Sequence, residues 1–354
     1  MKIVLDGGAN VKSITLGRTG ITVPRCAFGA LPIQRRSVED AVELLSGAYD
    51  CGFRFFDTAR AYSDSEEKLG LAFGKMRGGI IISTKTAAST PDGFWADLET
   101  SLETLKTDYI DIYQFHNPAA AYREGDGTGM YEAMLSARRQ GMISYIGITN
   151  HRIAVAEEAV NSGLYDTLQF PFSYLSGEKE EALVRLCAEK NVGFLCMKAL
   201  SGGLITNAKA AFAYLAQYEN VLPLWGIQRE SELRDFAYLM QEPAEMSDEL
   251  MEVISHDRAE LCGDFCRGCG YCKPCPAGIE IETCARMSLL LRRAPVASFT
   301  TPDMQKKMRR IEECRHCGAC ASRCPYSLDT PDLLKRNHDD FFDFLEQHGI
   351  PEAK

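Results

Sequence analysis

Apolar and polar positions along most of the chain follow two alternating patterns. Short apolar runs end in a polar residue or a glycine, and a longer stretch with helical spacing of its apolar residues follows each run. The short runs indicate buried strands, and the longer stretches indicate helices that bury one face. Eight strands are predicted in this way: Arg25–Gly29, Phe53–Asp57, Ile80–Lys85, Tyr109–His116, Ser144–Asn150, Thr167–Pro171, Val192–Met197 and Val221–Gly226.

Strands that alternate with a similar number of helices predict an α/β fold, specifically a (β/α)8 barrel. A doubly wound sheet would need fewer strands and a G-x-G-x-x-G fingerprint after the first strand, and the sequence contains no such fingerprint. Before the first strand, residues 12–23 alternate in polarity around Gly17 and Gly20, which indicates a β-hairpin.

The pattern changes after a predicted helix from Asp248 to about Leu261. Beyond it, helical segments are expected at 282–293, 304–313 and 332–347, between and after two cysteine-rich runs. We therefore predict two domains, a barrel over residues 1–260 and a mostly α-helical domain over residues 261–354.

Eight of the fourteen cysteines lie in these two runs, and each run ends in Cys-Pro. Cysteines at intervals of three residues can ligate one iron–sulfur cluster, while the cysteine before proline ligates the other cluster in two-cluster ferredoxins. Structural zinc sites favour two separated cysteine pairs, so two [4Fe-4S] clusters are the preferred interpretation. A disulfide framework is less favoured still. The predicted ligands are Cys266, Cys269, Cys272, Cys275, Cys314, Cys317, Cys320 and Cys324.

One ligand of the first run stays open, because that run is one residue shorter before its Cys-Pro than the bacterial pattern. Cys262 lies just upstream of this run, and Cys284 lies between the two runs. Both are expected to be ordinary buried thiols.

Charge and hydropathy limit the classes of partner. A net charge of −10 argues against nucleic acid, and the basic stretch from Lys306 to Arg310 is interpreted as a solvated helix face. No signal-peptide pattern occurs at the start, and no apolar run is long enough to span a membrane. We therefore expect a soluble, cytoplasmic protein with reduced thiols and no membrane partner.

Four ionisable residues fall at or just after the carboxyl ends of predicted strands, where side chains of a barrel converge. They are Asp57, Tyr62, Lys85 and His116. The segments around them, together with Gly147–Asn150, resemble the aldo-keto reductase family in consistent order over roughly residues 12 to 245. With the cysteine runs, the chain resembles an iron–sulfur branch of that family.

The resemblance implies a nicotinamide-dependent reaction that interconverts a small-molecule carbonyl and an alcohol. Tyr62 would be the general acid, and Lys85 would lower the pKa of its phenol. Asp57 would keep Lys85 charged and oriented, and His116 would hydrogen-bond the substrate carbonyl.

The resemblance also assigns a nucleotide site. Asn150 and Gln169 would hold the nicotinamide carboxamide. Met197, followed by Lys198, stands where the family usually stacks an aromatic ring on the nicotinamide. Gln228, Arg229 and Glu232 would lie at the adenosine end, where Glu232 replaces an arginine expected for the 2′-phosphate. The choice between NADPH and NADH therefore stays open.

Three functions remain as hypotheses. The first is a reductase whose clusters exchange electrons with a redox partner protein. The second is a non-enzymatic electron carrier or binding subunit on a reductase scaffold, and the third is a reductase whose clusters are only structural. A hydride carries two electrons together, whereas each cluster passes one electron at a time. Under the first hypothesis, direct transfer between the nicotinamide and a cluster would therefore need a high-energy radical. A flavin or a radical-tolerant substrate would resolve this, but no flavin motif is present in the sequence.

Overall fold

The protein is described by a computed structural model that covers residues 11–261, 265–293 and 296–353. Eight parallel strands close into a barrel in the order β10-β3-β4-β5-β6-β7-β8-β9. The predicted (β/α)8 barrel is therefore confirmed. The strands are β3 (Ala27–Gly29), β4 (Phe55–Asp57), β5 (Ile81–Thr86), β6 (Ile110–His116), β7 (Ile143–Thr149), β8 (Thr167–Pro171), β9 (Gly193–Met197) and β10 (Val221–Gly226).

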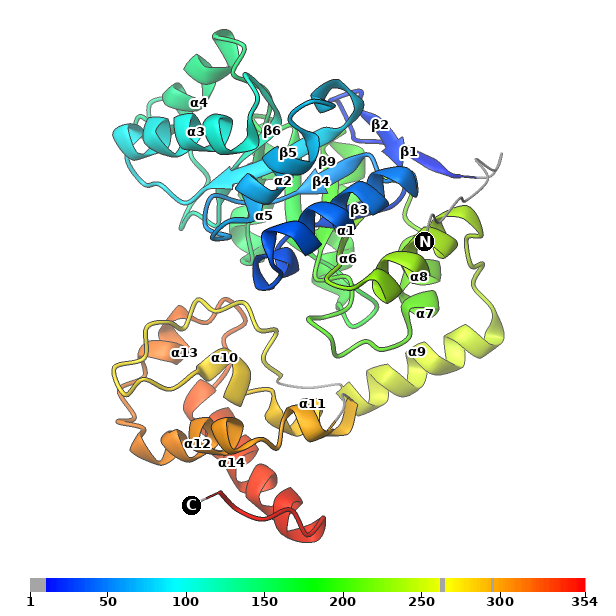
Figure 1. Ribbon diagram of the computed structural model, residues 1–354. Helices are drawn as coiled ribbons and strands as arrows, with labels where there is room; N and C mark the ends of the chain where they lie inside the picture. The colour runs from blue at the N-terminus through cyan, green and yellow to red at the C-terminus, as the bar shows by residue number, and fades with distance from the viewer. Residues whose placement is uncertain (1–10, 262–264, 294–295, 354) are drawn as a thin grey trace. The chain divides into compact units, whose positions relative to one another are not determined.

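Helices alternate with these strands and surround the barrel (Figure 1). They are α1 (Val38–Asp50), α2 (Ser65–Phe73), α3 (Pro91–Leu105), α4 (Met130–Arg139), α5 (Ile153–Ser162), α6 (Glu178–Glu189), α7 (Ala208–Leu215) and α8 (Glu230–Gln241). Local sequence sets several of their ends. The Ser37 and Thr90 side chains accept hydrogen bonds from the first turns of α1 and α3, as N-cap residues do.

The predicted hairpin is present as β1 (Ser13–Thr15) paired antiparallel with β2 (Thr22–Pro24). Its residues Ile14, Leu16 and Val23 join a buried apolar cluster with residues near the amino ends of barrel strands, such as Phe55 and Leu222. The amino-terminal end of the barrel is therefore filled by apolar side chains. Polar side chains gather at the carboxyl end instead.

The contacts of the chain divide it into two compact units. The first contains residues up to Ala199 together with Ala208–Met251, and the second contains Leu200–Asn207 together with Glu252–Lys354. The boundary between the units at Met251 falls within α9 (Asp248–Leu261), whose bounds agree with the predicted helix.

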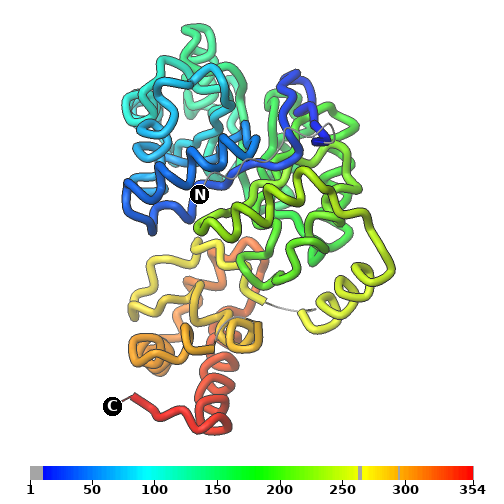
Figure 2. Tube along the Cα trace, turned by 45° about the vertical axis from the view of Figure 1, so that its right-hand side comes forward, coloured from blue at the N-terminus to red at the C-terminus, as the bar shows by residue number. Residues whose placement is uncertain are grey.

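The rest of the second unit consists of four short helices and the long helix α14, joined by loops that carry most of the cysteines of the two runs (Figure 2). The helix expected over 282–293 is instead two helices, because regular α-helix stops at Cys284 and resumes at Met287. The elements are α10 (Ile281–Cys284), α11 (Met287–Arg293), α12 (Pro302–Arg309), α13 (Ala319–Arg323) and α14 (Thr330–Gln347), with 3-10 turns at Val296–Ser298 and Arg310–Glu313.

This unit has its own core, in which Met287, Met308 and Phe341 are fully buried. Six of the cysteines in the two runs pack against that core. Cys284 is also buried there and its thiol faces the Lys307 carbonyl oxygen at 3.7 Å, as expected of an ordinary core thiol. Cys262 lies outside the described residues.

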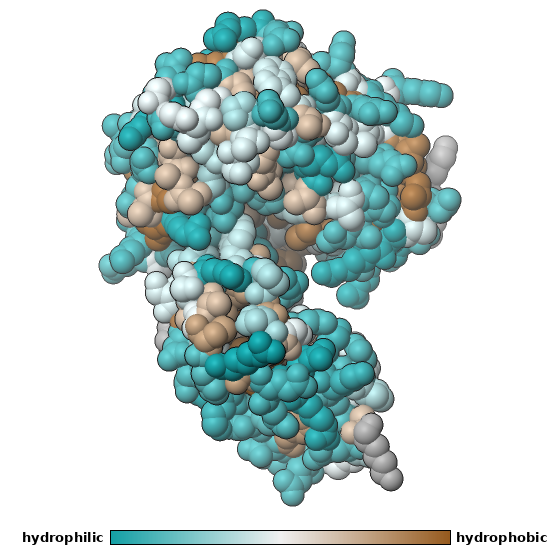
Figure 3. Space-filling view, turned by 90° about the vertical axis from the view of Figure 1, so that its left-hand side faces the viewer, coloured by the Kyte–Doolittle hydropathy of each residue, from teal (hydrophilic) through white to brown (hydrophobic). Residues whose placement is uncertain are grey.

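The face in Figure 3 is covered largely by hydrophilic residues, with apolar residues in small patches. Within the described parts of the chain, no helix combines the length and apolar character needed to cross a membrane.

Candidate functional site

The four residues predicted for catalysis meet at the carboxyl end of the barrel. Asp57 and His116 are the last residues of β4 and β6, and Lys85 lies near the end of β5. Tyr62 lies between β4 and α2, in a loop whose backbone N–H groups bond back to nearby carbonyls. Neighbouring parallel strands end at one rim, and this brings residues distant in sequence together.

Lys85 and Asp57 form a buried ion pair at the centre of this group. The Lys85 Nζ atom lies 2.8 Å from each carboxylate oxygen of Asp57 and donates to the Thr58 carbonyl oxygen at 2.6 Å. Only 1% of Lys85 and 4% of Asp57 are exposed. Burial lowers the pKa of Lys85, and Asp57 opposes that change by stabilising the ammonium form. Asp57 therefore keeps Lys85 charged in an interior that disfavours charge.

Tyr62 and His116 lie above this pair. The Tyr62 ring centroid is 5.4 Å from Lys85 Nζ, so the ammonium lies close enough to act on the phenol. The Tyr62 and His116 rings meet edge to face, with centroids 5.9 Å apart. Burial, and then the charge of Lys85, lower the pKa of His116 to about 3. His116 is therefore a neutral imidazole near pH 7.

Sequence reasoning missed a polar network beneath the four residues. The Gln114 Nε2 atom donates to Ser83 Oγ at 2.8 Å and to Gln169 Oε1 at 2.7 Å. Gln169 Nε2 then donates to Asp57 Oδ2 at 3.2 Å. Gln114 lies two residues before His116 in β6, so strand alternation places both on the same face. That spacing was the available signal.

Glu66 is a second residue that sequence reasoning missed. It is 1% exposed, and its carboxylate accepts hydrogen bonds from Thr84 at 2.6 Å and Ser101 at 2.8 Å and pairs with Arg60. Its negative charge helps to raise the pKa of Lys85. Nothing in the sequence distinguishes Glu66 from the exposed Glu67 beside it.

The residues expected at the nicotinamide lie in or just after three consecutive strands. Asn150 follows β7, Gln169 is in β8 and Met197 ends β9, where Thr149 Oγ1 lies 3.9 Å from its sulfur. Both amides already have partners, since Asn150 Nδ2 donates to the Pro118 carbonyl oxygen at 2.9 Å. Lys198 follows with a left-handed backbone, φ +60°.

The residues expected at the adenosine end lie where α8 begins. The Glu232 carboxylate accepts hydrogen bonds from the backbone N–H groups of Gln228 at 2.7 Å and Arg229 at 3.0 Å. Arg229 lies 3.6 Å from the same carboxylate, and its side chain is 71% exposed. Glu232 therefore caps its own helix and places a negative charge at the helix N-terminus.

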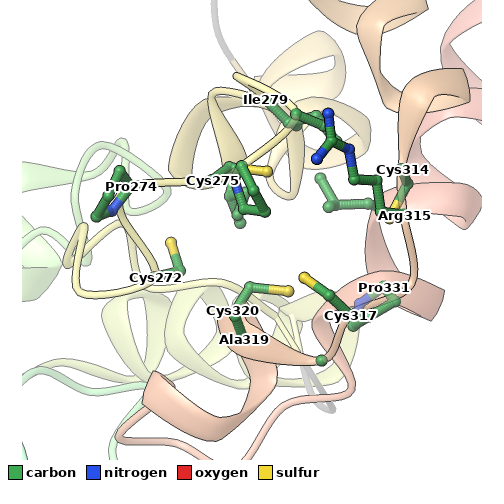
Figure 4. A pocket seen from close by; sticks show the side chains of 15 residues that line it. Cys272, Pro274, Cys275, Ile279, Cys314, Arg315, Cys317, Ala319, Cys320 and Pro331 are labelled. Carbon is green, nitrogen blue, oxygen red and sulfur yellow. The ribbon is translucent and has the colours of Figure 1, made fainter.

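The eight predicted cysteine ligands line two pockets, and each pocket draws on both runs. Cys275 lies with Cys314, Cys317 and Cys320, and the sulfur atoms of Cys275, Cys317 and Cys320 point into the pocket (Figure 4). Cys266, Cys269 and Cys272 line the other pocket with Cys324. The cysteine before each proline thus joins the other run, as the sequence pattern predicts. Cys272 also borders the first pocket.

The spacing of these thiols does not suit a single metal ion. A tetrahedral zinc site with Zn–S bonds of about 2.3 Å brings its sulfurs to about 3.8 Å from one another. Among the described residues, only His256, Asp257 and Glu260 place three such ligand atoms within 4.8 Å of one another. No set of three cysteine sulfurs among the described residues lies within that distance.

Apolar and basic residues surround the two cysteine pockets. Ile281 lines both pockets, Leu333 lines one and Leu334 the other. Burial raises the pKa of the Cys266 thiol, and the positive charge of Arg286 acts in the opposite direction. Arg286 donates to the Gly202 carbonyl oxygen at 2.5 Å, within the same unit.

The basic stretch near the second run is paired with acidic groups. Lys307 lies 3.0 Å from Asp303 and 3.2 Å from Glu280. Arg309 pairs with Glu352, and Arg310 pairs with Glu313. This mixture of charges agrees with a solvated helix face.

Comparisons with known proteins divide the chain in the same way as the sequence. Residues 27–253 match the model of the aldo/keto reductase family, and residues 265–329 match a 4Fe-4S dicluster domain. The chain is 28% identical over 205 residues to the uncharacterized oxidoreductase YqkF of Bacillus subtilis, an alignment that covers 54% of this chain and 65% of that relative. The chain thus spans just under two thirds of that relative's length.

A second curated relative is the aldo-keto reductase YhdN of Bacillus subtilis, 28% identical over 212 residues, with 54% of this chain and 63% of the relative covered. Among solved structures, an aldo-keto reductase from Klebsiella pneumoniae in complex with NADPH superposes with a TM-score of 0.61. It is 19% identical, covers 70% of this chain and is itself covered over 95% of its length. At that identity the likeness shows the fold.

The low pKa of His116 can be checked by NMR. We expect the imidazole resonance that disappears in His116→Gln to stay constant between pH 5 and pH 8, because burial and Lys85 keep the ring neutral down to about pH 3. A titration midpoint near 6.5 would mean that the ring is exposed to water and does not experience the charge of Lys85.

Proposed function

We propose that this chain, which belongs to the aldo/keto reductase family, interconverts a carbonyl and an alcohol with a nicotinamide cofactor at the site formed by Tyr62, Lys85, Asp57 and His116. The observation that carries the proposal is the buried Lys85–Asp57 pair beneath the Tyr62 ring. Burying two charges is costly unless both are well paired, and here they lie at the rim where barrel enzymes hold their substrates.

Each residue has a role that its surroundings support. A bound nicotinamide would supply the hydride, and Tyr62 would donate a proton to the substrate oxygen in reduction. The ammonium of Lys85, 5.4 Å from the Tyr62 ring centroid, would stabilise the phenolate that remains after this proton transfer. His116, held neutral, retains one N–H group that can donate to the substrate oxygen and orient it.

For the nucleotide, we expect the site to prefer NADH to NADPH. Backbone N–H groups at the start of a helix commonly bind phosphate, but Glu232 already occupies those of Gln228 and Arg229. Its carboxylate would repel a 2′-phosphate. Asn150, Gln169, Met197 and Lys198 are proposed at the nicotinamide because they lie in or just after adjacent strands at the same rim.

In the second unit, we expect two [4Fe-4S] clusters, one in each group of four cysteines. The thiols are spaced too widely for a single ion, and apolar side chains surround them. Such clusters supply one-electron transfer when bound. Cys317 is the exposed member of the eight, so its group offers the shorter route to a redox partner protein.

The electron-carrier hypothesis and the structural-cluster hypothesis rest on fewer observations. If the protein were only an electron carrier, the buried ion pair of the barrel would have no function. Clusters that only stabilise the fold give no reason for an exposed cysteine ligand, since solvent exposure makes a cluster easier to damage. The substrate remains a small carbonyl or alcohol compound, because the rim loops that would select it do not define it further.

Loss of the Tyr62 hydroxyl should abolish most of the activity. We expect Tyr62→Phe to bind nucleotide normally but to reduce a model aldehyde about a hundredfold more slowly, the usual scale for loss of a general acid. Tyr49→Phe is the matched control, since Tyr49 lies on α1 and packs against Phe73. Equal turnover in Tyr62→Phe and wild type would remove Tyr62 from the reaction.

Metal analysis of cysteine variants tests both the cluster count and the ligand groups. Anaerobically purified protein should hold about eight irons and eight sulfides. Paired Cys→Ser changes at Cys266 and Cys324 should leave about half of the iron, because both residues belong to one group. The pair Cys320 and Cys324 should remove nearly all of it, because these residues belong to different groups although they share a run.

Cys284→Ser is the control and should keep all of the iron, because Cys284 is part of the core. Stoichiometric zinc in the wild type would contradict the cluster proposal itself. Iron contents that follow the runs rather than the groups would contradict only the exchange of ligands.

Nucleotide preference tests the role of Glu232. Glu232→Gln should bind NADPH more tightly than wild type does, because the amide oxygen can still cap α8 but no longer repels phosphate. Glu232→Arg should add a charge-assisted contact of about 1.5–3 kcal/mol, reduced by solvent exposure. Titrations of both nucleotides, followed by intrinsic fluorescence, give the comparison. Equal changes for NADH and NADPH would show that Glu232 does not meet the 2′ position.

A further inference from the structure

The buried side chain of Gln114 has no assigned role, although it lies directly beneath the proposed site. Gln114 is fully buried in β6, and its Nε2 atom makes two hydrogen bonds inside the barrel. Its Oε1 atom is also buried and has no hydrogen-bond partner. A buried acceptor without a partner destabilises the fold by about 1–3 kcal/mol, so an apolar side chain would serve packing better.

The barrel also leaves space for this particular side chain. Gly147 of β7 lies opposite Gln114 in the strand register. A Cβ atom at Gly147 would lie 2.7 Å from Gln114 Cγ and 2.6 Å from Thr167 Oγ1, closer than real contacts allow. Gln114 can therefore occupy the interior only because residue 147 is a glycine.

The chemistry of the acceptors fixes the direction of every hydrogen bond in the network. An ionised Asp57 can only accept, so the atom of Gln169 that faces it must be the Nε2 donor. Gln169 then presents its Oε1 acceptor to Gln114, which must donate. If Gln114 were removed, the Gln169 amide could rotate and lose its bond to Asp57.

We propose that Gln114 is a positioning residue of the reductase site: it locks the Gln169 amide so that this amide donates to Asp57 and holds the carboxylate against Lys85. The inference rests on the proposed function. It assigns Gln169 a structural task in addition to the nicotinamide contact expected of it. The consequence is that Lys85 stays protonated to a higher pH than it would beside a mobile carboxylate.

Gln114→Leu tests the proposal with little expected effect on stability. The change removes one unpartnered acceptor, Gln114 Oε1, but takes a donor away from two others, Gln169 Oε1 and Ser83 Oγ, of which the Ser83 hydroxyl can rotate to a new partner. We expect kcat to fall about tenfold or more, the scale of one hydrogen bond to a charged group. Activity in the wild type should fall as the pH rises through the pKa of Lys85. In the variant that decline should begin at lower pH, because a mobile Asp57 raises the pKa of Lys85 less.

Two further variants complete the kinetic test. Tyr113→Phe is the matched control, because Tyr113 is the preceding residue of β6 and packs against Phe94 of α3. Its pH profile should match the wild type. In an Asp57→Asn background, Gln114→Leu should cause no further change, since Gln114 acts through Asp57. An unchanged pH profile in Gln114→Leu, or independent effects of the two changes, would overturn the proposal.

A readout without turnover separates this proposal from the proposed function. The side-chain amide protons of Gln169, assigned by comparison with Gln169→Leu, should exchange slowly with solvent in the wild type and faster in Gln114→Leu. If the protein has no reductase activity and this difference is still present, only the proposed function fails. If exchange is equally slow in both proteins, Gln114 does not hold Gln169.

Discussion

Burial of an ammonium group inside the barrel is the constraint on which the upper part of the barrel depends. Lys85 is almost fully enclosed, and a charge in such a place requires a counter-charge and hydrogen bonds for both partners. Asp57 supplies the counter-charge and Thr58 supplies a further acceptor. Gln169 and Gln114 extend the bonding to the next strands. At the amino-terminal end of the same barrel, the hairpin packs against a cluster of buried apolar side chains.

The second unit is organised by different forces. Its apolar core is small, and six cysteines of the two runs pack directly against that core. Loops rather than regular elements carry most of the first run. Because this core is small, ligand bonds to the cysteines would contribute a large part of the stability, as in other small metal-binding domains. The barrel, in contrast, is closed by hydrogen bonds between its own strands.

The sequence was most informative where one residue type serves one purpose. Apolar periodicity predicted the barrel strands to within a few residues, and cysteine spacing predicted which residues line the two pockets. The sequence was not informative where the position of a residue in space decides its role. Glu66 and Glu67 are adjacent and chemically identical, yet only Glu66 faces the interior. Gln114 required knowledge of its neighbours across β7 and β8, which no local pattern contains. The prediction of one helix over 282–293 was wrong because the helical spacing of the apolar residues does not change at Ala285 and Arg286. The regular helix is nevertheless interrupted at these two residues.

The proposed exchange of ligands between the two cysteine runs would have a consequence for biosynthesis. Neither group of four is complete when the ribosome has made only the first run, since one group waits for Cys324 and the other for Cys314, Cys317 and Cys320. During that interval the nascent chain presents four thiols without their proper partners. Free thiols in this state can capture zinc or oxidise. With the proposed ligand sets, cluster insertion would have to follow synthesis of the whole segment, and a factor that shields the first run would raise the yield of correctly loaded protein.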